Sequence, residues 1–79
     1  MDHVVADFIA WLEVQNPEVV YNWGDVHNCA VAQYFKSTGA NDSETWHTKG
    51  IILDPIAHKE PRTFGALLHR AKERMTNAV

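Results

Sequence analysis

The only cysteine of the chain is the residue with the most evident chemistry. Cys29 lies in DVHNCAVAQYF, residues 25–35, a run that predicts a helix starting at Asp25. A cysteine near a helix N-terminus can become a thiolate nucleophile, and His47 in TWHT could act as its general base. With Asp25 as N-cap, however, Cys29 lies one turn inside the helix, where the effect of the helix dipole has faded. We therefore interpret Cys29 as a small apolar core residue, and we keep a Cys29–His47 pair as the alternative.

Metal binding is the second chemistry that these residue types allow. The pair His27-x-Cys29 is shorter than the ligand spacings of structural zinc sites, and no second ligand pair follows it. Helix geometry would also point these two side chains in different directions. We expect no metal site and, because no phosphate-loop or dinucleotide motif occurs, no cofactor. The remaining histidines are interpreted as surface residues: His3, His47, His58 and His69.

The charges are unevenly distributed along the chain. The net charge is −3, yet residues 1–60 carry nine acids against three lysines, or −6, whereas residues 61–79 carry four arginines and lysines against one acid, or +3. An acidic body makes direct nucleic-acid binding unlikely, since neutralising phosphates requires a basic face. It suits instead a protein partner with a basic surface. The candidate binding carboxylates lie off the apolar stripes: Asp7, Glu13, Glu18, Asp42 and Glu44.

Three tryptophans are many for 79 residues, and a core this small can hardly cover all of them. Trp11 lies beside the apolar stripe of its helix, Trp23 is in an irregular lead, and Trp46 is in a polar stretch. We therefore add Trp23 and Trp46 to the binding residues, with a homodimer as another way of covering exposed aromatic surface.

Apolar periodicity predicts the elements that must position these residues. Val5, Phe8, Ile9 and Leu12 form one stripe of a helix over residues 3–15. A second helix, residues 26–36, is apolar all round and should be central. It should end at Gly39, which is available for a left-handed conformation. A third helix carries the stripe Phe64, Leu67, Leu68, Ala71 and Met75, with Thr63 as its N-cap and Gly65 at a close packing contact.

The segments between these helices are harder to assign. Residues 39–50 are polar and glycine-bounded, with Asp42 or Ser43 able to cap a single helical turn. Residues 18–22 and 51–53 are rich in β-branched residues and could pair. The prediction is a mainly α fold: one domain over residues 1–79, a compact three-helix domain with a possible short two-stranded hairpin. Gln33, in the middle of the apolar helix, should hydrogen-bond to residues 17–24 or 51–53.

Localisation follows from what the sequence lacks. The start, MDHVVADF, has no basic segment followed by a long apolar one, so we expect no signal peptide. No apolar run approaches the roughly 20 residues that span a bilayer. A single cysteine cannot form an intramolecular disulfide. These features favour a cytoplasmic protein without a membrane partner.

Two resemblances bear on function. GDVHNCAVAQYF resembles the nucleophile helix of papain-like folds, which would imply a cysteine-dependent enzyme or its relic, although the chain has little room for the sheet that holds the histidine there. YNWGDVHNCAVAQYFKSTG followed by PRTFGALLHRA resembles small uncharacterised phage and prophage proteins, over roughly residues 18–37 and 61–71. The second resemblance implies a non-enzymatic protein that binds and inhibits a host protein, such as an anti-CRISPR-like defence inhibitor. A structural or dimerising module is the remaining alternative.

Overall fold

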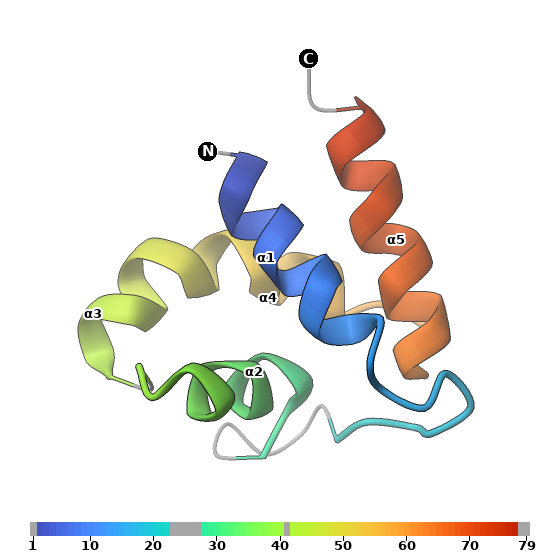
Figure 1. Cartoon of the computed structure of the whole chain (residues 1–79), viewed down its shortest axis with the longest axis horizontal. Helices are drawn as coiled ribbons and strands as arrows, with labels where there is room; N and C mark the ends of the chain where they lie inside the picture. The colour runs from blue at the N-terminus through green and yellow to red at the C-terminus, as the bar shows by residue number, and fades with distance from the viewer. Residues whose placement is uncertain (1, 23–27, 41, 78–79) are drawn as a thin grey trace.

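The described part of the chain is mostly helical, as predicted for a mainly α fold. The computed structural model describes residues 2–22, 28–40 and 42–77. Its elements, in chain order, are α1 (Asp2–Leu12), α2 (Ala30–Thr38), α3 (Ser43–Thr45), the π-helix η1 (Trp46–Gly50), α4 (Ile51–Ala57) and α5 (Phe64–Asn77). Helices α1 and α5 lie side by side and run in opposite directions, and α2 crosses below α1 (Figure 1).

The core is built where the apolar stripes of α1, α2 and α5 meet. Phe8 and Leu12 of α1 and Leu67 of α5 are fully or almost fully buried, as their spacing predicts. Aromatic rings join the three helices, because Tyr34 of α2 lies 5.1 Å from Phe8 between ring centroids, and Trp11 lies 5.9 Å from Phe64. These contacts confirm the first and third predicted helices and place α2 against α1, although α1 ends at Leu12 and not at residue 15.

Helix α2 begins later than predicted. Cys29 is its N-cap, with an extended backbone at φ −67° and ψ 168°, so the first helical residue is Ala30. The expectation that Cys29 lies one turn inside the helix is therefore wrong. Residues 23–27, which include Trp23 and the expected cap Asp25, lie outside the described residues. The predicted end is confirmed, since Gly39 adopts φ 74° and donates its N–H to the carbonyl of Lys36.

The predicted hairpin between residues 18–22 and 51–53 is wrong, because residues 51–53 belong to α4. Residues 43–57 form α3, η1 and α4 in direct succession, and Pro55 lies inside the last of these. Leu53, Ile56 and Ala57 are buried at helical spacing. Burial of this stripe outweighs the low helix propensity of Ile51 and Ile52.

Residues 17 and 18 lie in a turn, and the segment from residue 17 to 21 pairs with residues 62–65 instead of residues 51–53. Tyr21 donates its N–H to the carbonyl of Arg62 at 3.0 Å, and Phe64 donates to Val19 at 3.0 Å. An isolated antiparallel bridge joins Val20 to Thr63. Gly65 completes the contact, because a Cβ atom there would lie 2.9 Å from the Cβ of Pro17. The predicted close packing at Gly65 is thus confirmed, and Pro17 is its cause.

Arg70 ties three segments together behind this pairing. Its Nε donates to the carbonyl of Ile56 at 3.0 Å, its Nη1 to the carbonyl of Pro61 at 2.8 Å, and its Nη2 to the hydroxyl of Tyr21 at 2.8 Å. The Tyr21 hydroxyl in turn donates to the carbonyl of Ala57. This network fixes the end of α4, the α4–α5 connection and the extended segment on one face of α5.

Candidate functional site

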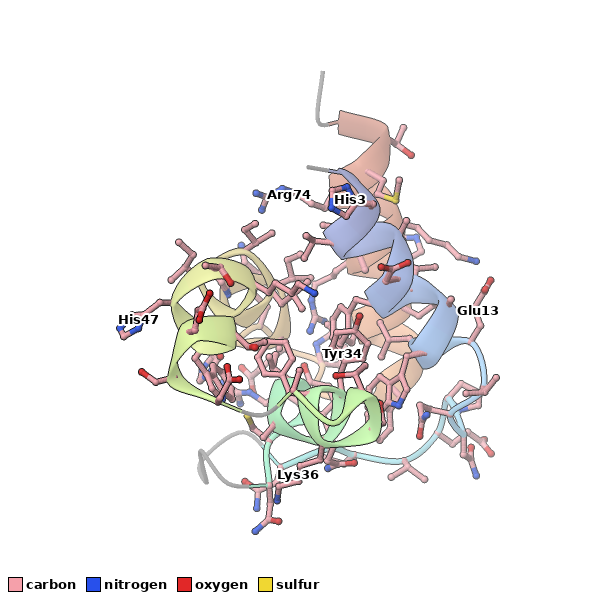
Figure 2. All side chains as sticks on the ribbon, turned by 60° about the vertical axis from the view of Figure 1, so that its left-hand side comes forward. His3, Glu13, Tyr34, Lys36, His47 and Arg74 are labelled. Carbon is pink, nitrogen blue, oxygen red and sulfur yellow. The ribbon has the colours of Figure 1, made fainter. Side chains whose placement is uncertain are left out.

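The alternative catalytic pair is not assembled. Cys29 is 7% exposed, whereas His47 is exposed on η1 and projects away from the body of the protein (Figure 2). A nucleophile and its base must come within hydrogen-bond reach, and a buried thiol and an outward imidazole do not. Cys29 occupies the N-cap of α2, and its thiol makes no capping hydrogen bond.

Metal-ligating side chains are likewise dispersed. Over residues 2–22, 28–40 and 42–77, His, Cys, Asp and Glu do not form any group of three or more that could hold a metal ion. His58 pairs with Asp54 at 3.1 Å and His69 with Glu73 at 3.4 Å, each one helical turn apart on an exposed face. Gln33 is also engaged locally, since its amide donates to the carbonyl of Asn28 at 2.9 Å and not to the segments that we had expected.

The predicted acidic residues are all exposed but belong to separate regions. Asp42 caps α3 by accepting the N–H of Thr45 at 2.7 Å. Hydrogen bonds from the side chain and backbone of Thr45 hold the pKa of Asp42 below its ordinary value. Glu44 lies in the first turn of the same helix. Glu13 and the α3–η1 region occupy opposite sides of the protein, so the predicted acids do not make one face (Figure 2).

Asp7 and Tyr34 form a local electrostatic pair on the α1–α2 side. Burial, with a smaller contribution from the negative charge of Asp7, raises the pKa of the Tyr34 hydroxyl above its ordinary value. Tyr34 is otherwise held by aromatic contacts with Phe8, Trp11 and Phe35. Asp7 thus lies beside a core residue and apart from the other predicted acids.

The aromatic residues proposed for binding are core residues where they are described. Trp46 is partly buried and packs edge-on against Phe35, with ring centroids 4.9 Å apart. Trp11 is partly buried among Phe8, Tyr34 and Phe64. Trp23 lies outside the described residues. The large exposed apolar side chains of the described regions are aliphatic instead: Val14, Val19, Val20 and Ile51.

Three of these aliphatic residues lie within one short segment together with two of the predicted acids. The exposed fractions are 78% for Val14, 45% for Val19 and 63% for Val20. Glu13 and Glu18 are exposed in the same stretch. We call this set the 13–20 surface: Glu13, Val14, Glu18, Val19 and Val20. It follows α1 and leads towards the start of α5 (Figure 1). An exposed apolar group rimmed by charge is typical of an interaction site.

The 13–20 surface is held by backbone turns, not by side-chain packing. Val14 donates its N–H to Trp11 and Val19 donates to Asn16, which closes two successive turns. The Asn16 side chain also accepts the N–H of Glu18 at 3.0 Å. The contact of Pro17 with Gly65 anchors the segment to α5. Because Val20 occupies a non-hydrogen-bonded pair with Thr63, its own N–H and carbonyl point away from residues 62–65.

Sequence reasoning found the acids of this surface but missed its valines. The missing signal was the period of two in an extended segment. If Val19 and Val20 are both extended, they cannot both face the core, and Val14 lies off the helical stripe that ends at Leu12. These three valines were therefore identifiable as candidates for exposure once the stripe had been assigned.

Glu13 also contacts α5. Its Oε2 lies 3.6 Å from Lys72 Nζ, and both side chains are about half exposed. Such an exposed pair contributes about 0–1 kcal/mol at most, so it leaves Glu13 able to exchange partners. Glu13 can therefore release Lys72 and pair with a basic group of a partner.

Comparisons with known proteins do not extend these observations. Neither the protein-family models, nor the curated proteins, nor the solved structures gave a match to this chain. Within the described residues, none of the helices combines the length and apolar character needed to cross a membrane.

Proposed function

We propose that this chain is a small non-enzymatic binding protein that docks onto another protein through the 13–20 surface. The observation that carries the proposal is the clustering of Val14, Val19 and Val20 with Glu13 and Glu18 in one exposed segment. The partner would present an apolar patch with a basic rim. If the resemblance to phage proteins reflects its origin, that partner is a host protein in the cytoplasm, and the chain modulates or inhibits it.

Two physical arguments support this partner chemistry. Covering the exposed valines with a partner contributes about 25 cal/mol of binding free energy for each Å² of apolar surface removed from water. Acids around them favour a basic partner, and the charge of −6 over residues 1–60 steers its approach. The valines would thus supply affinity and the acids would supply orientation and association rate.

The test compares two variants that bear the same change at equally exposed positions. Val20→Asp introduces a charge into the 13–20 surface, whereas Ile51→Asp introduces one at a 67% exposed residue outside it. Immobilised wild-type protein and both variants are exposed to host lysate, and captured proteins are identified and then titrated as pure components. We expect Val20→Asp to lose the partner and Ile51→Asp to retain it. Because both sites are exposed, neither variant should change the free energy of unfolding by more than about 0.5 kcal/mol.

Salt tests the acidic rim separately. The association rate with the purified partner should fall as ionic strength rises, and Glu13→Lys with Glu18→Lys should slow it further. A partner that binds Val20→Asp as tightly as wild type would disprove this surface. Concentration-dependent light scattering that is abolished by Val20→Asp would assign the surface to a homodimer instead. A Cys29→Ala variant that loses activity while remaining folded would favour the enzyme alternative.

A further inference from the structure

A hollow of about 280 Å³ lies between α4 and α5, away from the 13–20 surface. Its wall consists of Pro55, Ile56, Lys59, Arg70, Glu73 and Arg74. All of these except Ile56 and Arg70 are exposed, so the hollow opens to solvent. Its volume is at the lower end of the range of small-molecule sites, which suits a single compact group.

The hollow has an excess of positive charge. Lys59, Arg70 and Arg74 stand against the single carboxylate of Glu73, which leaves a formal charge of +2. Glu73 Oε1 lies 3.4 Å from His69 Nδ1, outside the hollow. The other ion pairs between described residues involve neither Lys59, Arg70 nor Arg74. Three cations therefore gather here without a carboxylate partner in the described structure, although the chain as a whole is acidic.

The guanidinium of Arg70 is already oriented before any ligand binds. Its guanidinium is partly buried, and its three hydrogen bonds go to the neutral acceptors Ile56 O, Pro61 O and Tyr21 Oη. Neutral acceptors orient the group but do not cancel its charge. A guanidinium has five N–H donors, so two remain for a ligand. The side chain is already fixed, and an anion bound beside it would not have to order it.

We propose that the α4–α5 hollow binds a phosphate group, either free or carried by a small molecule. A phosphate monoester carries about −1.5 to −2 charges near neutral pH, which matches the +2 of the wall. Its oxygens accept hydrogen bonds from the fixed guanidinium of Arg70, while Lys59 of the α4–α5 connection and Arg74 of α5 supply further positive charge. This site is independent of the protein partner proposed above.

The experiment titrates the full-length protein with inorganic phosphate and with phenyl phosphate at constant ionic strength, following binding by protein-detected NMR and thermal denaturation. Succinate serves as a dianion that lacks the phosphate group. Lys59→Ala and Arg74→Ala remove exposed cations that form no ion pair with the described residues, so both variants should fold. Each should weaken phosphate binding about tenfold, the usual effect of one charge-assisted contact. Lys49→Ala is the matched control, since it removes an exposed lysine outside the hollow.

The outcomes separate the ligand sources. Binding of both phosphates, lost in the two hollow variants and kept in Lys49→Ala, supports the site. Tighter binding of phenyl phosphate would identify a monoester, and equal binding would identify free phosphate. Succinate binding as well as phosphate would overturn the assignment of a phosphate group. An unchanged melting temperature and spectrum with both phosphates, or equal weakening by Lys49→Ala, would overturn the site itself.

Discussion

The α4–α5 hollow and the 13–20 surface differ in how their side chains are held. In the hollow, Arg70 is fixed by three hydrogen bonds that also join α4, α5 and residue 21. On the 13–20 surface, the valines extend from backbone turns and their side chains are largely in water. A change in the hollow therefore tests stability and binding together, whereas a change on the surface tests binding almost alone. This distinction determines which variants are informative for each proposal.

Arg70→Met should have the largest effect. It keeps the length and apolar packing of the side chain but removes three hydrogen bonds, leaving the Ile56 and Pro61 carbonyls without this donor. We expect a loss of about 3 kcal/mol in the free energy of unfolding, measured by urea denaturation. Arg74→Met on the same helix is the control and should change it by less than about 0.5 kcal/mol. Equal stability of the two variants would show that the hydrogen bonds of Arg70 do not fix the hollow.

Gly65→Ala should have an intermediate effect on the free energy of unfolding, and whether it stabilises or destabilises the protein is informative. Helix propensity alone would stabilise α5 by about 1 kcal/mol. The new Cβ would, however, lie 2.9 Å from Pro17 Cβ and 3.0 Å from the Pro17 carbonyl oxygen, which itself accepts the N–H of Gly65. We expect overpacking to dominate, with a net loss of about 1–2 kcal/mol in thermal or urea denaturation. A stabilised variant would mean that the 13–20 surface is not anchored to α5 at this contact.

Alkaline pH should lower the free energy of unfolding through Tyr21, the partner of Arg70, and this effect should be smaller than those of the two substitutions. Burial raises the pKa of the Tyr21 hydroxyl above its ordinary value of 10.0, and the charge of Arg70 only partly opposes this. The unfolded chain therefore loses the proton first. The contribution of Tyr21 is complete below about pH 10 and is lost as the pH rises through the folded pKa.

The measurement is the urea midpoint between pH 8 and 11 for wild type, Tyr21→Phe and Tyr34→Phe. Tyr34 is included because its pKa is also raised by burial. Each substitution should flatten the alkaline decline, and Tyr21→Phe should also lower the midpoint at pH 8 because it removes the hydroxyl that Arg70 contacts. An identical decline in all three proteins would exclude both hydroxyls as its source.

The helices at the two ends of the described chain could be predicted because their apolar stripes are local and uninterrupted. Phe8 and Leu12 of α1 and Phe64 and Leu67 of α5 are buried as their spacing indicates. The cap of α5 was also predictable, since Thr63 Oγ1 accepts the N–H of Ala66 at 3.2 Å.

Helix α4 could not be predicted from local preference. Ile51 and Ile52 favour a strand, and Pro55 removes a helical hydrogen bond, so each residue taken singly argues against a helix. Only the burial of Leu53, Ile56 and Ala57 against the rest of the protein decides the outcome. That is a tertiary effect, which overrides propensity and leaves only a short stripe in the sequence.

The candidate sites were predictable in part for a similar reason. Glu13 and Glu18 could be recognised as exposed from their position off the stripe. The role of Arg70 could not be recognised, because its contact with Tyr21 joins residues 49 positions apart and no local pattern marks it.

The pairing of the first and last helices also determines when this protein becomes stable during synthesis. Helix α1 leaves the ribosome well before α5, the helix that covers its stripe. Bringing together Trp11 and Phe64, which are 53 positions apart, costs about 3 kcal/mol of chain entropy, which only the completed contacts can offset. Until then Phe8 and Leu12 remain exposed to chaperones and proteases. The yield of this protein in the cell therefore depends on how its nascent chain is protected, as well as on its final stability.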